Sequence, residues 1–121
     1  LLGADESAAP ALTQIIESNS SMDRWLLVAN VCLIAPLFEE LFFRGFLLQQ
    51  FSRFVGQTNA VVVTSLLFAS VHLSLESFLP LMSLSIILSM TYRYTHSLWA
   101  PIITHAVWNS TTVFTVLVLY S

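Results

Sequence analysis

The sequence predicts an all-α protein, a polytopic bundle of transmembrane helices. Hydrophobic residues make up 56% of the 121 residues and charged residues 9%, against about 25% in ordinary soluble domains. The basic residues are four arginines, with no lysine, so the chain carries too little charge to cover a soluble surface. The apolar residues also form long stretches separated by short polar segments, as in membrane-spanning helices.

The first 23 residues are expected to be a polar lead-in to a membrane core of residues 24–121. This lead-in holds four of the seven acidic residues, a run of serine and asparagine, and one expected interfacial helix near Ala9–Ser18. The chain starts without methionine and without the pattern of a signal peptide. We therefore expect a piece of a longer protein that has further helices.

Four helical spans are predicted in the core. The first begins at Arg24 and continues through Phe54. A straight helix of that length would overrun a hydrocarbon core of about 30 Å, so Pro36 is expected to kink it. Short turns separate the remaining spans, which favours packing as antiparallel hairpins. These spans are Asn59–Leu75, Phe78–Tyr92 and Leu98–Tyr120.

Charge gives the orientation and excludes one class of partner. Alternating spans place Arg53 and Arg93 on the same side, predicted to be the cytoplasmic or equivalent side. A net charge of −3 excludes a basic surface for nucleic acid. Cys32 lies in an apolar run and is expected to be a small buried hydrophobe. The sequence leaves open a bacterial inner membrane, a chloroplast or the endoplasmic reticulum.

Three charged residues interrupt the first span. Glu40 and Arg44 are spaced i, i+4 with the acid first, the favourable order for a helical ion pair. Glu39 is rotated by about 100° from Glu40, so the two carboxylates are not expected to face the same point. Ionisable residues at bilayer depth are costly and mark functional sites. Glu40 and Arg44 are therefore interpreted as a neutralising pair, and Glu39 as the reactive carboxylate.

Two later spans contribute histidines. His72 comes four residues after Phe68, and His105 comes four residues before Asn109, so each pair lines one helix face. All of these positions are expected in the interior of their spans. A carboxylate and two imidazoles on three helices predict a shared site.

Two chemistries fit this site, and the sequence does not choose between them. Glu39, His72 and His105 could bind zinc as a His₂Glu set with an open position for water. Without metal, Glu39 could act as a general base on a water held by His72. In both cases His105 and Asn109 could donate hydrogen bonds to an oxyanion. A haem-binding bundle with both histidines as axial ligands is a further alternative, which would show a Soret band.

The ordered motifs on these spans resemble those of a known family. The glutamate pair followed by Arg44, Phe68-x-x-x-His72 and His105-x-x-x-Asn109 are similar to the three motifs of the CPBP family, the CAAX proteases and bacteriocin-processing proteins. The similarity covers residues from about 25 to 120. His96 stands where members of the family often carry glycine, and it is expected to be an exposed turn residue.

The resemblance implies an intramembrane endopeptidase acting on a peptide or lipidated protein within the membrane. In prenyl-processing members, three residues are removed after a lipidated cysteine. By motif, Glu39 and His72 would activate the water, His105 and Asn109 would support the oxyanion, and Glu40 with Arg44 would hold the site together. Family members are described both as metalloproteases and as metal-free glutamate enzymes. A non-catalytic immunity or scaffold protein of the same fold is the alternative function. The sequence does not give the oligomeric state.

Overall fold

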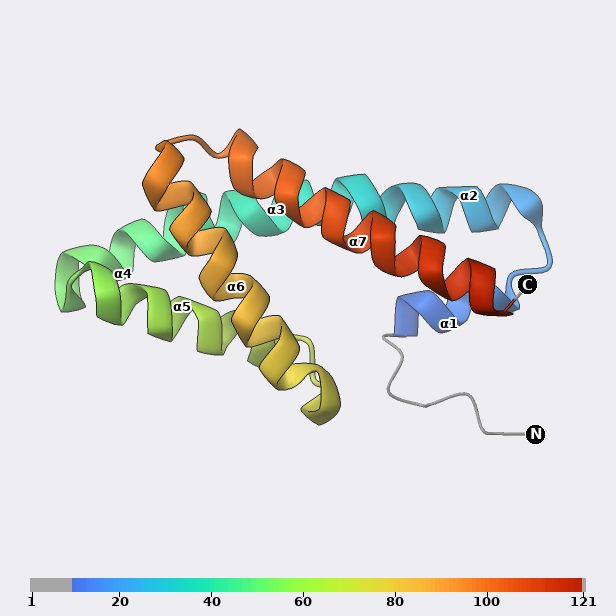
Figure 1. Cartoon of the computed structure of the whole chain (residues 1–121), viewed down its shortest axis with the longest axis horizontal. Coiled ribbons are helices and arrows are strands. Elements are labelled where there is room, and N and C mark those ends of the chain that lie inside the picture. Colours follow the sequence, from blue (N-terminus) through green and yellow to red (C-terminus); the bar gives the residue numbers. More distant parts are fainter. Residues whose placement is uncertain (1–9, 121) are drawn as a thin grey trace.

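The computed structural model describes residues 10–120, and within them the secondary structure is entirely helical (Figure 1). This confirms the all-α bundle. A helix is present where one was predicted near Ala9–Ser18, although Ala9 lies outside the described residues. The described helical segments are α1 (Pro10–Glu17), a continuous segment over Ser21–Val55, α5 (Gln57–Val71), α6 (Leu75–Thr95) and α7 (Trp99–Tyr120).

The long segment contains two π-helical turns. Its parts are α2 (Ser21–Ala29), η1 (Asn30–Ile34), α3 (Ala35–Phe42), η2 (Phe43–Leu47) and α4 (Leu48–Val55). At the end of η1 the N–H of Ala35 donates to the carbonyl of Asn30, and at the end of η2 the N–H of Leu48 donates to the carbonyl of Phe43. Turns of this kind are rare and are frequently found at functional sites. The disturbance predicted at Pro36 thus coincides with a π-helical turn.

Local sequence signals define the helix ends. The side chain of Ser20 accepts a hydrogen bond from the N–H of Asp23, and that of Ser74 accepts one from Ser77, so both serines are N-caps. Gly56 joins α4 to α5 with a φ of 81°, a conformation that favours glycine. His96 ends α6 in the left-handed conformation and is exposed, as expected for a turn residue.

Among residues 10–120, three helices are long and apolar enough to cross a membrane. They are Ser21–Val55, Leu75–Thr95 and Trp99–Leu119. The predicted second span is wrong in length, because α5 has 15 residues and is about 22 Å long, shorter than a hydrocarbon core of about 30 Å. The polytopic arrangement stands, with three full-length spans and one short apolar helix within the described residues.

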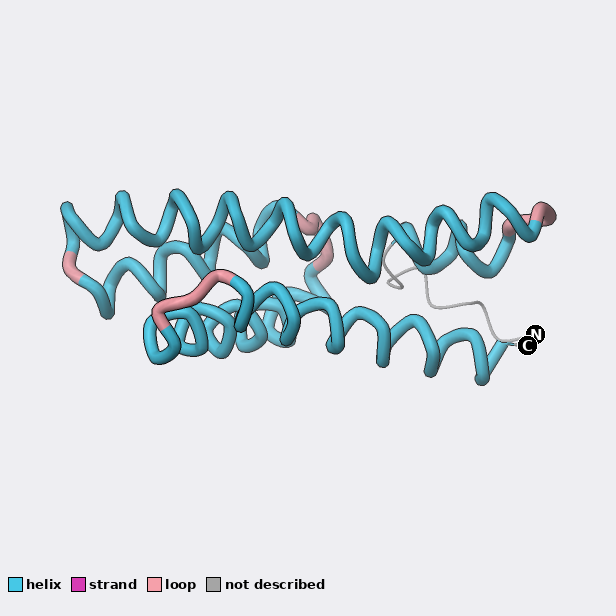
Figure 2. Tube along the Cα trace, turned by 90° about the horizontal axis from the view of Figure 1, so that it is seen from above, coloured by secondary structure: helices cyan, strands magenta, loops and turns pink. Residues whose placement is uncertain are grey.

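Helices α5 and α7 pack against different parts of the long segment, and α6 packs against both of them. Figures 1 and 2 show α7 running beside the long segment, where it contacts η1 and α3. Helix α5 returns along α4, and α6 crosses from α5 to α7 (Figure 1). The helices that carry the candidate site residues are therefore neighbours.

Along the long segment, two apolar clusters lie on either side of Glu39, Glu40 and Arg44. One is built on Cys32, which is buried as predicted, and it joins α1, η1 and α7 through Ile15 and Val113. The other joins α4 and α5 through Leu48, Ala60 and Val61. The two glutamates and Arg44 in the middle of the long segment therefore have an apolar cluster before and after them.

The two arginines that set the predicted orientation are at the same end of the bundle. Arg53 lies in the last turn of α4, directly before the turn to α5. Arg93, near the end of α6, donates a hydrogen bond of 2.6 Å to Oε1 of Gln57, the first residue of α5. Both charges thus lie at one end of the bundle, while the side of the membrane stays a prediction.

Candidate active site

The ion pair predicted within the long segment is present and fully buried. A guanidinium nitrogen of Arg44 donates to Oε1 of Glu40 over 3.1 Å, and both side chains are 0% exposed. Each charge makes the other tolerable, since an unpaired charge at this depth would cost several kcal/mol. Glu40 and Arg44 are thus a buried, mutually neutralised pair.

His105 on α7 contacts Glu40 of this pair directly. Its Nδ1 lies 2.7 Å from Oε1 of Glu40, the same oxygen that accepts from Arg44. A carboxylate that is ion-paired to a guanidinium is an acceptor only, so Nδ1 of His105 carries the hydrogen. In the neutral ring, Nε2 is then the free base. Glu40 therefore sets the tautomer and orientation of His105 as well as neutralising Arg44.

Glu39 lies at the other nitrogen of the same ring. Its Oε2 is 3.8 Å from Nε2 of His105, and the side chain is 31% exposed. The prediction that Glu39 and Glu40 cannot face the same point is wrong in this respect. Although the two carboxylates point in different directions around the helix, they approach the same imidazole. Glu40 lies at Nδ1 of His105 and Glu39 lies at Nε2. Glu39 Oε2 is buried and has no hydrogen-bond partner in the described part of the chain.

His72 lies at the end of α5, and its predicted position in the interior of a span is wrong. Its Nδ1 donates to the carbonyl of Phe68 over 2.7 Å, so Nε2 is again the free nitrogen. The Phe68 ring centroid lies 4.9 Å from that of His72 and 5.8 Å from that of His105. Both histidines therefore contact the same phenyl ring. The next residue, Leu73, is 92% exposed and has a φ of 54°, which is strained for leucine.

Asn109 makes a contact that sequence reasoning did not foresee. Its side-chain amide donates to the carbonyl of Val31 in η1 over 2.9 Å. In a π-helical turn the partner of this carbonyl would be the N–H five residues on, which is missing in Pro36. The N–H of Ala35, the α-helical partner, donates to Asn30 instead. Asn109 therefore satisfies a carbonyl that the turn leaves free, and one amide hydrogen remains for other use.

Two residues of the site were missed as participants. Ser85 on α6 accepts two hydrogen bonds from one guanidinium nitrogen of Arg44, at 2.7 Å to its carbonyl and 2.6 Å to its hydroxyl. Phe68, known only as part of a motif, lies under the guanidinium with its ring centroid 5.1 Å from Cζ of Arg44. A serine in an apolar helix is the only sequence signal for the first contact.

The proposed metal ligands are not gathered into a metal site. Among residues 10–120, no group of three histidine, cysteine, aspartate or glutamate side chains is placed to share a metal ion. The donor chemistry would suit zinc, since Nε2 is free in His72 and His105 while Nδ1 donates to an acceptor in each. In the described part of the chain, however, Glu39 lies within ion-pair distance of His105 and not of His72.

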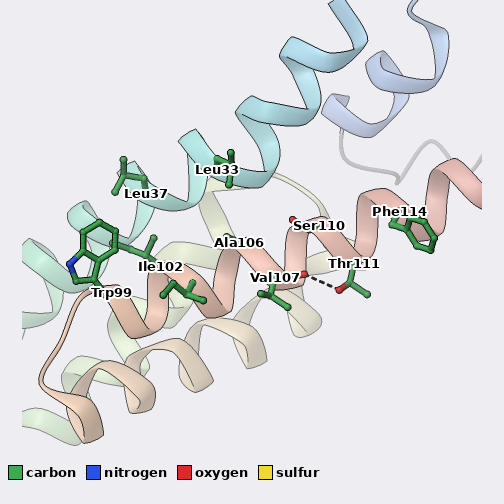
Figure 3. A pocket seen from close by; sticks show the side chains of 10 residues that line it. Leu33, Leu37, Trp99, Ile102, Ala106, Val107, Ser110, Thr111 and Phe114 are labelled. Carbon is green, nitrogen blue, oxygen red and sulfur yellow. Dashed lines mark hydrogen bonds between the residues drawn. The ribbon is translucent and has the colours of Figure 1, made fainter. Parts of the chain in front are cut away.

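An apolar groove of about 740 Å³ lies between the long segment and α7 (Figure 3). Leu33 and Leu37 line one side, and Ile102 and Ala106, which flank His105 in the sequence, line the other. Trp99 lies at one end of the groove and Phe114 toward the other (Figure 3). The remaining lining residues are Ile103, Val107, Ser110 and Thr111.

The fold and site together define a polytopic helical membrane protein with a buried glutamate–arginine–histidine cluster. The chain belongs to the family of type II CAAX prenyl endopeptidase Rce1-like proteins, whose family model matches residues 21–111. The match spans all of the motif residues, and it agrees with the family indicated by the sequence motifs. No curated protein and no solved structure matches the chain with significant similarity.

Proposed function

We propose that the chain is an intramembrane endopeptidase that hydrolyses a peptide bond of a membrane-associated substrate. The observation that carries the proposal is the pairing of two carboxylates with the two nitrogens of His105, at 2.7 Å and 3.8 Å. One carboxylate is neutralised and orients the ring, and the other is partly open. Family membership supports the same class of reaction.

In the proposed mechanism Glu39 is the general base. A water hydrogen-bonded to Oε2 of Glu39 and Nε2 of His105 would lie beside the 3.8 Å line that joins these atoms. Glu39 removes a proton from the water as its oxygen attacks the scissile carbonyl, and returns the proton to the leaving amine. Nε2 of His72 can accept the second hydrogen of the water in place of Nε2 of His105.

The oxyanion of the tetrahedral intermediate needs donors. When His72 holds the water, a His105 ring that is already protonated can donate from Nε2 to the oxyanion, and Glu40 stabilises that imidazolium through Nδ1. The ring keeps this proton throughout, so the proton of the water passes only to Glu39 and then to the amine. The second amide hydrogen of Asn109 is a further candidate donor. Zinc at Glu39, His72 and His105 stays a proposal from the residue types alone, and no step of this mechanism requires it.

The groove supports an apolar substrate. Its volume of about 740 Å³ is within the range of small-ligand sites, and most of its lining side chains are hydrocarbon. Because Ile102 and Ala106 flank His105, a lipid chain in the groove would bring the attached peptide close to the histidine. We propose a CAAX-type substrate, cleaved after its prenylated cysteine.

The test is cleavage of a quenched fluorescent peptide with a farnesylated CAAX-type C-terminus by the full chain in proteoliposomes. We expect release of the terminal tripeptide, detected by mass spectrometry, and loss of at least about 10³-fold in kcat for Glu39→Gln. Glu76→Gln, an isosteric change at an exposed glutamate of α6, is the matched control and should be active. Equal activity of Glu39→Gln and wild type would contradict the enzyme and favour the non-catalytic scaffold protein.

A further inference from the structure

We propose that Ser85 is a positioning residue that holds His105 in place through Arg44 and Glu40. The inference rests on the proposed function for its catalytic consequence, but its geometric part stands on the contacts alone. Ser85, Arg44 and Glu40 are all 0% exposed, and His105 is 3% exposed. The four residues come from the long segment, α6 and α7, so the chain of contacts joins three helices.

The first step is the contact between Glu40 and Arg44, which does not fix the guanidinium by itself. Only Oε1 of Glu40 is engaged, while Oε2 is buried without a partner in the described part of the chain. A single hydrogen bond leaves the guanidinium free to rotate about it, unlike a two-bonded fork. Nε of Arg44 is also without a described partner.

The second step is that Ser85 supplies the missing constraint. Its carbonyl and its hydroxyl both accept from the same nitrogen, at 2.7 Å and 2.6 Å, so they use both hydrogens of that nitrogen. Together with the Phe68 ring beneath it, this fixes the plane of the guanidinium of Arg44. The carbonyl contact belongs to the backbone, whereas the hydroxyl contact depends on serine at this position.

The third step is the transfer of this constraint to His105. Oε1 of Glu40 is shared between Arg44 at 3.1 Å and His105 at 2.7 Å. A movement of the guanidinium therefore changes the direction of the carboxylate that orients the imidazole. Because reaction rates fall steeply with misplacement of a catalytic group by about 1 Å, the loss of the hydroxyl should reduce turnover.

Helix α6 offers a matched control one turn away. Ser89 is also 0% exposed and lies four residues after Ser85 on the same helix face, but its hydroxyl has no described partner. Ser85→Ala and Ser89→Ala remove the same atom at equal burial. If Ser85 only allows close helix packing, both alanine variants should behave alike.

The experiment uses the full chain in nanodiscs with ¹⁵N-labelled histidine and the farnesylated peptide as substrate. For Ser85→Ala we expect kcat to fall about 10- to 100-fold with KM unchanged, and the Nδ1–H resonance of His105 to shift. Ser89→Ala should change neither, and Ser85→Thr, which keeps the hydroxyl, should restore both. A variant lacking His105 assigns the resonance.

The outcomes separate this proposal from the proposed function. Wild-type kcat and an unchanged resonance in Ser85→Ala would overturn the positioning role even if the chain is an active peptidase. If wild type cleaves nothing, the resonance still decides the positioning role, because that measurement needs no substrate. If Ser85→Ala fails to fold, Ser85→Cys is compared with Ser85→Thr instead. Cysteine has a similar volume to serine but is a much weaker acceptor. Equal Nδ1–H resonances of His105 in these two variants would also overturn the positioning role.

Discussion

Oε1 of Glu40 is the atom on which the site converges. It accepts from Arg44 and from Nδ1 of His105, so one oxygen links the buried cation to the candidate catalytic ring. A buried ion pair contributes little net stability by itself, because desolvation offsets most of the attraction. The pair is therefore better explained by the orientation that it gives to His105 than by its contribution to folding.

Replacing Glu40 by glutamine tests whether Glu40 keeps the hydrogen of the His105 ring on Nδ1. The amide can still accept from Arg44, but it can present an N–H toward His105, which would force the hydrogen of the ring onto Nε2. We expect kcat to fall about 10³- to 10⁴-fold, as for other tautomer-reversing changes in catalytic triads. The measurement is kcat on the farnesylated peptide, with histidine ¹⁵N shifts as the check on the tautomer. Near-wild-type kcat with the tautomer reversed would contradict this role.

Some of the site could be predicted at the residue scale. The spacing of Glu40 and Arg44 was sufficient for their ion pair, because both lie on one helix. The contacts of Ser85 and His105 with this pair could not be predicted, since they depend on how α6 and α7 cross the long segment. Helix rotation alone predicts that Glu39 and Glu40 point in different directions. It does not predict that both carboxylates approach the ring of His105.

Within the elements, η1 explains why Asn109 contacts the backbone. The π-helical turn and Pro36 together remove both helical donors from the carbonyl of Val31. A buried carbonyl without a partner costs about 1–3 kcal/mol, and the amide of Asn109 removes that cost while joining α7 to the long segment.

A double-mutant cycle can test this account. Asn109→Ala should lower the free energy of unfolding by about 1–3 kcal/mol. Pro36→Ala supplies an N–H that can bond to Val31, so the double variant should lose less stability than the two single changes together. The measurement is denaturation in detergent followed by circular dichroism. Strict additivity would show that Asn109 and the turn are independent.

The elements were predictable in type more than in extent. The length of each apolar run was sufficient to predict that the long segment, α6 and α7 are helices that can span a membrane. The same pattern predicted a helix as far as Leu75, whereas α5 ends at Val71. The reason is the left-handed conformation of Leu73, which cannot be predicted from a leucine in the sequence. The π-helical turns were not foreseen either, since one extra residue barely alters a pattern that is apolar on all sides.

Across the whole molecule, the polar site lies between two apolar clusters along the long segment. The cluster at Cys32 and the cluster at Leu48 flank the charged pair. Many large apolar side chains point outward, which suits contact with lipid. The site is thus held between two packed apolar clusters, in a bundle that exposes many apolar side chains.

The ends of the long segment should lie on opposite sides of the membrane. We expect a membrane-impermeant maleimide to label Asn19→Cys and Thr58→Cys, both exposed positions, from opposite sides, in a background where Cys32 is replaced by serine. Thr58 is expected on the cytoplasmic or equivalent side with the arginines. Labelling of both positions from the same side would contradict a membrane-crossing long segment.

The two π-helical turns have a consequence for chain length in related sequences. Each turn inserts one residue into an otherwise α-helical register, which rotates everything after it by about 100°. If η1 became α-helical with all its residues kept, Glu40 would turn away from α7 although no residue type had changed. Insertions and deletions should therefore be tolerated in the turns near Ser18, Gly56 and Ser97. In the α-helical part between the two π-helical turns, Ala35–Phe42, they should be selected against.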